Sequence, residues 1–312
     1  MTSPWTALDI PDLTGQLAVV TGANSGLGFH TARELGAHGA QVIMACRDPA
    51  KAQAALKQLR AELPSASFSL QALDLADLAS VRRFAGTMTE QHAHLDLLCN
   101  NAGVMALPRR TTRDGFEMQF GTNHLGHFAL TGLLLPLLQK APAARVVTVS
   151  SLAYLIGRIR FDDVQGAKRY AKWPAYGQSK LANLMFAIEL GRRLGARGVA
   201  GRIKSLAAHP GYAATGLQMV GPQMANSAVR QWLMKLSNAL VSQPAAMGAL
   251  PTLRAATAPD AASGEFYGPS GLWQIRGTPV RTKPRARATD AAVAAQLWSL
   301  SERLTGVSYL SS

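Results

Sequence analysis

The chain has 312 residues, of which 48% are hydrophobic and 16% are charged, a composition that excludes a disordered or fibrous protein and can bury a large core. The 32 basic and 18 acidic residues give a net charge of +14. Residues 1–100 have 7 basic and 9 acidic residues and a net charge of −2. Residues 101–200 have 14 and 5, a net charge of +9, and residues 201–312 have 11 and 4, a net charge of +7. Residues 1–14 contain neither a basic segment followed by an apolar core nor a run of membrane-spanning length, so we expect no secretion signal, no transmembrane segment and a cytoplasmic location.

The first predicted unit is a strand, a glycine-rich turn and a helix. The apolar run Leu17–Val20 leads into a turn that begins at Thr21, and a helical pattern then continues through Leu35 and stops near Gly39. In this order, glycines let the backbone and the helix N-terminus approach a pyrophosphate. Glycine turns also join strands to helices where no ligand binds, but the flanking pattern favours a dinucleotide site. The turn residues expected at the cofactor are Gly22, Asn24, Ser25, Gly26, Leu27 and Gly28.

The second predicted strand, Gln41–Cys46, is followed by a basic residue. An NAD-preferring site usually has Asp or Glu here to bind the ribose 2′-hydroxyl, whereas Arg47 can pair with a 2′-phosphate. The alternative is that Arg47 is solvated and Asp48 selects NAD. Because Asp48, which a proline follows, fits the cap of a helix over Ala50–Leu63, we predict a preference for NADP(H), with NAD less favoured.

Three later apolar runs end in polar or glycine-containing segments. They are Leu95–Cys99 before Asn100-Asn101-Ala102-Gly103, Arg145–Val149 before Ser150-Ser151, and Ile203–Ala208 before His209-Pro210-Gly211. Ligands of an open parallel sheet bind outside the carboxyl ends of its strands, so these segments converge on one site. Strand-like runs alternate with helical patterns and no linker divides them, which predicts an α/β fold: a single Rossmann-like doubly wound parallel sheet with helices on both faces, in one domain over residues 1–312.

Cysteines and histidines offer weaker signals. Cys46 and Cys99 lie in strand-like runs, where buried thiols are more usual than a disulfide or metal pair, and no Cys/His spacing indicates a metal site. For His124 and His127 we favour packing and solvent contact on a helix over a catalytic role, and His209 is a candidate for lining the pocket.

Tyr176 and Lys180 form the pair with the clearest chemistry. Of the six tyrosines, only Tyr176 has a lysine four residues further on. On a helix this spacing places both side chains on one face, where the ammonium can bias the phenol toward ionisation. Such a pair can donate a proton near neutral pH.

Together these motifs resemble those of short-chain dehydrogenases/reductases, and the resemblance extends from about Leu13 to Tyr267. The resemblance implies a catalytic tetrad of Asn123, Ser151, Tyr176 and Lys180. It implies cofactor contacts at the glycine turn, Asp74, Leu75, Asn101, Ala102, Gly103, Tyr176, Lys180, Pro210, Gly211 and Thr215. The segments 100–105, 123–128 and 179–183 most resemble the retinol-dehydrogenase-like branch, which includes the oxidoreductase domain found beside WW modules and, more distantly, light-dependent protochlorophyllide reductases.

The family resemblance also implies a mechanism. A hydride passes between a nicotinamide and a carbonyl or alcohol, Tyr176 donates a proton to the developing alkoxide, and Ser151 hydrogen-bonds the same oxygen. Lys180 stabilises the phenolate and holds the nicotinamide ribose, while Asn123 positions a water that passes protons toward Lys180.

Two other functions compete with this one. A light-dependent double-bond reductase of the protochlorophyllide type would use a similar tetrad, but no Cys follows Lys180, where those enzymes are expected to have a functional one. A non-enzymatic nucleotide-binding sensor commonly loses the Tyr or the Lys, and both are present here.

Three segments bear on the substrate and on partners. Residues 212–247 match the place of a substrate lid and are rich in Met and aromatic residues, so we expect a small apolar carbonyl or alcohol. The 24 residues between Ser151 and Tyr176 form a basic insert that could obstruct the usual helix-to-helix dimer, so we expect a monomer or a dimer through another surface. The basic run 276–287 has no recognised nucleic-acid module beside it, and we expect a solvated face and no nucleic-acid partner.

Overall fold

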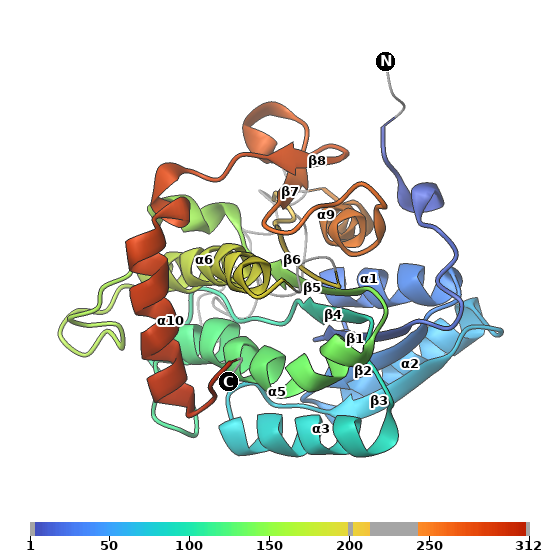
Figure 1. The fold of residues 1–312 in the computed structure, drawn as a ribbon, viewed down its shortest axis with the longest axis horizontal. Coiled ribbons are helices and arrows are strands. Elements are labelled where there is room, and N and C mark those ends of the chain that lie inside the picture. The colour runs from blue at the N-terminus through green and yellow to red at the C-terminus, as the bar shows by residue number, and fades with distance from the viewer. Residues whose placement is uncertain (1–3, 199–201, 213–242, 310–312) are drawn as a thin grey trace, which may run out of the picture.

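The computed structural model describes residues 4–198, 202–212 and 243–309. Its centre is an eight-stranded sheet in the order β3-β2-β1-β4-β5-β6-β7-β8 (Figure 1). The strands are β1 Leu17–Thr21, β2 Gln41–Cys46, β3 Phe68–Ala72, β4 Leu97–Asn100, β5 Ala144–Val149, β6 Ile203–Ala208, β7 Phe266–Pro269 and β8 Pro279–Thr282. The predicted parallel sheet is confirmed for β1 to β7, whereas β8 pairs antiparallel with β7. This last pair needs no helical crossover because a short loop joins the two strands.

Helices cover both faces of the sheet, as predicted. One hydrophobic cluster joins the sheet to α1, α2 and α9, and a second joins it to α3, α5, α6 and α10; Figure 1 shows α3 and α5 on one side of the strands and α1 and α9 on the other. The helices are α1 Gly26–Ala37, α2 Pro49–Glu62, α3 Leu78–Gln91, α4 Met118–Phe120, α5 Gly126–Lys140, α6 Lys172–Ala196, α9 Ala245–Thr257 and α10 Ala291–Thr305. Single turns or short helices of another type are η1 Ala7–Asp9, η2 Gly121–Leu125, η3 Leu152–Ile156, η4 Leu272–Gln274 and η5 Ala286–Thr289.

Strand β1 shows why an uninterrupted apolar run is needed at the centre. All of its residues are buried. Ala18 and Val20 point into the first cluster, and Leu17 and Val19 point into the second, because successive side chains of a strand face opposite sides. Thr21 ends the strand at the point where β1 lies between β2 and β4. The strand order reverses here, which creates a crevice outside the carboxyl ends of β1 and β4.

The predicted helix after β2 is confirmed with slightly different bounds. It runs over Pro49–Glu62, and the Asp48 side chain accepts a hydrogen bond from the Lys51 amide at 3.1 Å. The expected lid over residues 212–247 lies mostly outside the described residues. Its last three residues, 245–247, belong to the first turn of α9. Helix α9 packs on the sheet beside α1.

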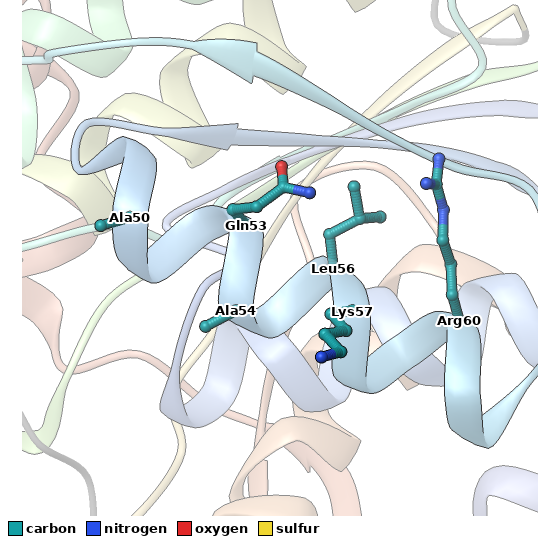
Figure 2. A pocket seen from close by; sticks show the side chains of 6 residues that line it. All are labelled: Ala50, Gln53, Ala54, Leu56, Lys57 and Arg60. Atoms are coloured by element: carbon teal, nitrogen blue, oxygen red, sulfur yellow. The ribbon is translucent and has the colours of Figure 1, made fainter.

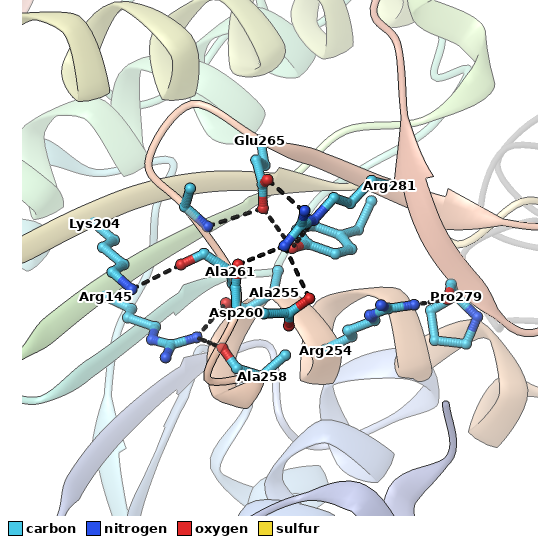
Figure 3. A network of polar contacts seen from close by, with 12 residues as sticks. Arg145, Lys204, Arg254, Ala255, Ala258, Asp260, Ala261, Glu265, Pro279 and Arg281 are labelled. Carbon is cyan, nitrogen blue, oxygen red and sulfur yellow. Dashed lines mark hydrogen bonds and ion pairs between the residues drawn. The ribbon is translucent and has the colours of Figure 1, made fainter. Parts of the chain in front are cut away.

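A polar network fixes the C-terminal strands to the sheet (Figure 3). Arg281 of β8 forms ion pairs with Asp260 at 2.9 Å and with Glu265 at 3.0 Å. Lys204 of β6 donates to the Ala261 carbonyl at 2.7 Å, and Arg145 of β5 donates to the Ala258 carbonyl at 2.8 Å. Within the basic run 276–287, Arg281 is therefore committed to the fold.

Further expectations concern the cysteines, metal sites and membrane-spanning helices. Cys46 and Cys99 are free and buried, and burial raises the pKa of their thiols to about 11 and about 12. Across residues 4–198, 202–212 and 243–309 no group of three His, Cys, Asp or Glu side chains could hold a metal ion. Over the same ranges, no helix combines the length and the apolar character needed to cross a membrane.

Candidate active site

A cleft of about 470 Å³ opens at the carboxyl edge of the sheet. It brings together nearly all of the residues singled out from the sequence. They are Gly22, Asn24, Ser25, Gly26, Leu27, Gly28, Arg47, Asp74, Leu75, Asn101, Ala102, Gly103, Ser151, Tyr176, Lys180, Pro210 and Gly211. Asn123 lies behind the cleft wall, and Thr215 lies outside the described residues.

The glycine turn forms the floor of the cleft at the end of β1. Gly22 and Gly26 have φ angles of +66° and +54°, which L side chains rarely adopt. A Cβ atom on Gly28 would lie 2.4 Å from the Gly22 carbonyl oxygen and 2.5 Å from Asn101 Nδ2. The turn conformation and close packing therefore require glycine at these positions.

Helix α1 begins at this turn and fits a phosphate group. Its N-cap residue, Ser25, makes no side-chain hydrogen bond to the helix, and the first turn contains no acidic residue. The first amides of a helix carry partial positive charge and have no partner within the helix. Because Ser25 to Gly28 line the cleft, these amides can receive the pyrophosphate of a dinucleotide.

Two cations and one acid stand where β2 meets α2. Arg47 is exposed at the end of β2, and Lys51 lies one turn into α2; both line the cleft. Asp48 lies between them, caps α2 and stands 3.6 Å from the Lys51 ammonium, so its carboxylate is engaged within the helix start. Sequence reasoning missed Lys51, although its position four residues after Arg47 placed it near the same end of the helix.

Asp74 follows β3 at the far end of the cleft. Its side chain accepts a hydrogen bond from the Ala76 amide at 3.0 Å, and its own amide donates to the Ser80 hydroxyl at 3.0 Å. These contacts stabilise the turn that presents Asp74 and Leu75 to the cleft.

The segment after β4 is held by Thr21, which sequence reasoning treated only as the start of the turn. The amides of Asn101 and Ala102 both donate to the Thr21 hydroxyl at 2.9 Å. In addition, the Asn101 side chain donates to the Thr21 carbonyl at 2.8 Å. The ends of β1 and β4 are thereby joined beside the cofactor cleft.

Ser151, Tyr176 and Lys180 meet at the opposite wall. Ser151 follows β5 and caps η3, where it accepts from the Ala153 amide at 3.2 Å, and the other two lie on α6. The Lys180 ammonium stands 5.8 Å from the centre of the Tyr176 ring and donates to the Val149 carbonyl at 3.1 Å. As predicted, the Tyr176 and Lys180 side chains lie on one face of the same helix.

The acid–base properties of this pair differ from the expectation. Burial raises the pKa of the Tyr176 phenol to about 12, against the opposing hydrogen bond with Ser151, and burial lowers the pKa of Lys180 to about 8. We expected the ammonium to ease ionisation of the phenol. Instead, removal of the phenol from water is the largest influence on its pKa, with the Ser151 hydrogen bond acting in the opposite direction.

Asn123 lies in a π-helix, η2, rather than in the ordinary helix that the sequence predicted. Its side-chain oxygen accepts from the Val104 amide at 2.7 Å, and its side-chain nitrogen donates to the Val104 carbonyl and to the Ser179 hydroxyl, both at 2.9 Å. Both protons of the amide are thus used. Asn123 braces the segment after β4 against α6, and π-helical turns are frequent at functional sites.

The three histidines near these motifs are all buried. Burial lowers the pKa of His124 to about 3 and the pKa values of His127 and His209 to about 4. The expected packing of His124 and His127 is found, but their expected solvent contact is wrong. His209 does not line the cleft either: its ring lies behind Pro210–Gly211 and bonds to Gln274 at 2.8 Å.

Apolar residues that the sequence motifs did not single out complete the cleft beside Tyr176. They are Val104, Met105, Leu152, Ala153 and Trp173. The Trp173 ring lies edge-on to the Tyr176 ring with centres 6.2 Å apart, and it remains 44% exposed. Its position three residues before Tyr176 on a helix was a usable signal.

A second hollow, of about 460 Å³, runs along the outer side of α2 (Figure 2). All of its lining residues come from that one helix and include two alanines, Leu56 and the stems of Lys57 and Arg60. It contains none of the residues of the cleft at the carboxyl edge, and its lining has no acid, nucleophile or backbone turn that could do chemistry. The cleft at the carboxyl edge is therefore the candidate site.

Comparisons with known proteins agree with this geometry. The family model described as short chain dehydrogenase matches residues 16–225. Retinol dehydrogenase 13 of Homo sapiens is 41% identical over 95% of this chain and 86% of its own length. Retinol dehydrogenase 12 of Mus musculus is 40% identical over 95% of this chain and 88% of its own length.

Solved structures show the same fold. An uncharacterized protein from Mycobacterium paratuberculosis has a TM-score of 0.80 and 44% identity, and the match covers 98% of this chain and 99% of that chain. RhlG of Pseudomonas aeruginosa, in its NADP complex, has a TM-score of 0.63 and 25% identity over 82% of this chain and 94% of that chain. The motifs, the cleft and these matches agree, and the chain belongs to the short-chain dehydrogenase family as an NAD(P)-dependent oxidoreductase similar to the retinol dehydrogenases.

Proposed function

We propose that this protein transfers a hydride between NADP(H) and an apolar carbonyl or alcohol. The observation that carries the proposal is the meeting of a polar and an apolar surface in one cleft: the polar group of Ser151, Tyr176 and Lys180 adjoins apolar side chains that include Met105 and Trp173. A substrate with one oxygen and a large apolar body matches both surfaces.

The choice of NADP rests on the end of β2. Among the described residues that line the cleft there, no acidic side chain is free to bind a ribose 2′-hydroxyl, because Asp48 caps α2 and pairs with Lys51. Arg47 and Lys51 both line the cleft and supply two positive charges for a 2′-phosphate. The similarity to RhlG, whose solved complex contains NADP, supports the same choice.

Cofactor binding and proton transfer are assigned to different residues of the cleft. The turn from Gly22 to Gly28 and the amides of α1 hold the pyrophosphate, and the bound nicotinamide supplies or accepts the hydride. In the reducing direction the Tyr176 hydroxyl gives its proton to the substrate oxygen, and the Ser151 hydroxyl donates a hydrogen bond to the same oxygen. Lys180, when charged, stabilises the phenolate that Tyr176 becomes.

The substrate class is drawn from the cleft and from the relatives. Within the described part of the chain, the cleft wall beside Tyr176 carries no cation other than Lys180, so a carboxylate substrate has no clamp there. Relatives at about 40% identity are retinol dehydrogenases, which act on an apolar alcohol by name. We therefore expect kcat/KM to rise with the apolar size of the substrate.

A substrate panel tests this function. Reduction of decanal, benzaldehyde, pyruvate and the aldehyde of retinol would be followed by loss of NADPH absorbance, in the dark and then in light. We expect turnover in the dark and a preference for the larger apolar aldehydes. A preference for pyruvate would contradict the apolar pocket, and activity that requires light would favour a double-bond reductase.

We also propose a monomer, or a dimer that uses a surface away from α6. Helix α10 covers part of α6: the Trp298 ring stacks on Phe186, and the Arg193 guanidinium lies over Trp298 at 4.4 Å. The η3 turn packs on α6 as well, with no space for a Cβ atom at Gly157 against the Gly177 carbonyl. A tetramer in light scattering would contradict this proposal.

A cytoplasmic location remains a proposal that rests on chemistry alone. Cys46 and Cys99 are unpaired thiols, which reducing compartments preserve. Recovery of the native protein in a secreted fraction would contradict it.

A further inference from the structure

The cleft has a cofactor wall, formed by the turn 22–28 and the segment after β4, and a proton-transfer wall, formed by Ser151, Tyr176 and Lys180 with Asn123 behind them. His127 is buried between these two walls and contacts both. On one side its Nε2 atom lies 2.9 Å from the Thr21 hydroxyl, at the end of β1. On the other side its Nδ1 atom lies 2.9 Å from the backbone carbonyl oxygen of Asn123, in the π-helix. The ring has no exposed surface. One side chain thus joins the cofactor wall to the tetrad.

The positions of the protons follow from the partners. A carbonyl oxygen only accepts, so Nδ1 of His127 carries the proton and donates it to Asn123. In the neutral ring, Nε2 is then an acceptor, and the Thr21 hydroxyl donates to it. Burial keeps the ring neutral by lowering the pKa of His127 to about 4. The opposite tautomer would set Nδ1 and a carbonyl oxygen, two acceptors, against each other.

This arrangement also orients the Thr21 hydroxyl. Its oxygen already accepts two hydrogen bonds, from the amides of Asn101 and Ala102. Its single proton has two possible acceptors, His127 Nε2 at 2.9 Å and the Cys99 carbonyl at 3.3 Å. The shorter contact fixes the hydroxyl so that both lone pairs face the two amides. His127 therefore stabilises the backbone on which one side of the cofactor lies.

The second nitrogen acts on the other wall. Asn123 braces Val104 and the Ser179 hydroxyl, and that hydroxyl in turn donates to the Tyr176 carbonyl at 2.8 Å. Holding the Asn123 carbonyl therefore holds the chain of contacts that ends at the proton donor.

We propose that His127 is a positioning residue for the oxidoreductase reaction, with Nε2 serving cofactor binding through Thr21 and Nδ1 serving turnover through Asn123. The alternative is that His127 is a packing residue whose two bonds contribute only to stability. Its neighbour His124 provides the comparison, because it is equally buried on the same segment but contacts Ser301 of α10 and aromatic rings instead.

Two variants separate the two nitrogens. In His127→Asn the side-chain amide stands near the place of Nδ1, so it can still donate to Asn123, but the Thr21 hydroxyl loses its nearer acceptor and keeps only the Cys99 carbonyl. In His127→Gln the amide reaches the place of Nε2, so its oxygen can accept from Thr21, but Asn123 loses its donor. In His127→Asn we expect the Kd for NADPH to rise about tenfold and kcat to change less than about twofold. In His127→Gln we expect kcat to fall about tenfold and the Kd for NADPH to change less than about twofold.

The measurements are a fluorescence titration with NADPH and steady-state reduction of decanal at saturating NADPH, each beside a thermal melt. His124→Asn and His124→Gln are the matched controls, expected to lower Tm while leaving Kd and kcat within about twofold. Equal changes of Kd and kcat in both His127 variants, or equal effects of the His124 variants, would overturn the proposal. The titration needs no substrate, so a failure to reduce decanal would count against the proposed function and leave the Kd comparison decisive.

A third variant serves if substitutions at His127 do not fold. Thr21→Val removes only the hydroxyl, and we expect the Kd for NADPH to rise about tenfold, with Thr21→Ser restoring it. An unchanged Kd in Thr21→Val would overturn the assignment of Nε2 to cofactor binding.

Discussion

The two walls of the cleft are built by different means. On the cofactor wall the backbone does most of the work: glycines at 22, 26 and 28 shape the turn, and uncapped amides of α1 face the cleft. On the proton-transfer wall, buried side chains contact one another and distant carbonyls, as in the bonds of Asn123 to Val104 and of Lys180 to Val149. The first wall tolerates little added volume, whereas the second tolerates little loss of a polar atom.

The difference also appears in charge. The residues up to 100, which build the cofactor wall as far as β4, carry nearly balanced charge, and the excess of basic residues lies in the remainder of the chain. Within residues 1–100, Arg47 and Lys51 line the cleft. The acid between them, Asp48, already caps α2 and pairs with Lys51. We therefore propose that this local pair of cations, rather than the net charge of the protein, selects the 2′-phosphate of NADP(H).

The largest expected effect is on the proton-transfer wall. Tyr176→Phe removes the proton donor while keeping the ring, so kcat should fall by on the order of 10²-fold or more, with the Kd for NADPH changed little. Steady-state kinetics on decanal and an NADPH titration measure the two quantities. Tyr154→Phe, at another buried tyrosine near the cleft, is the control and should keep its turnover. Normal turnover in Tyr176→Phe would show that Tyr176 is not the proton donor and would contradict the difference drawn between the two walls.

Added volume tests the cofactor wall. In Gly28→Ala the new methyl would meet the Gly22 carbonyl at 2.4 Å, and backbone cannot move aside as a flexible side chain can. We expect the Kd for NADPH to rise between about tenfold and a hundredfold. Gly86→Ala on α3 is the matched control, because nothing lies within 4 Å of the place that its methyl would occupy and a helix gains from alanine. Equal NADPH affinity in the two variants would contradict a wall set by backbone geometry.

The pH dependence of reduction tests the charge on Lys180. Its pKa is lowered to about 8, so the group is charged below that pH and neutral above it, and the phenolate loses its stabilising charge as pH rises. We expect kcat/KM, which reports the free enzyme, to fall about tenfold per pH unit above about pH 8. The profile belongs to the coupled pair of Lys180 and Tyr176. A profile that stays flat to about pH 10 would show that the lysine charge has no part in the rate.

The smallest expected effect concerns cofactor choice. Arg47→Gln should raise the Kd for NADPH about tenfold and leave the Kd for NADH nearly unchanged, because only the 2′-phosphate requires the charge. Lys57→Gln, an exposed cation further along α2 and away from the cleft, is the control and should change neither value. Comparable affinity of the wild-type protein for NADH and NADPH would sink the predicted preference before any substitution is made.

The sequence could predict local patterns but not the contacts between distant segments. The glycine turn and the segment after β4 each follow an apolar strand, and this order predicts that they lie at one edge of a parallel sheet. The spacing of Tyr176 and Lys180 predicts one helix face, and the family resemblance added their place in the same site. The bonds of the Asn123 side chain to Val104 and Ser179, and the bond between Thr21 and His127, join residues from distant segments, which no local spacing encodes. The raised pKa of Tyr176 was missed for a related reason: burial of the pair depends on the whole fold around it.

The C-terminal helix has a consequence for how the protein is made. Trp298 and Tyr309 complete an aromatic cluster with Phe128 and Phe186, and the Tyr309 hydroxyl donates to the Phe128 carbonyl at 2.5 Å, across 181 residues of sequence. During synthesis, the helices that carry Phe128 and Phe186 emerge long before the segment that covers them. The nascent chain therefore exposes this apolar face until the segment from Trp298 to Tyr309 has been added, and chaperones can act during that interval.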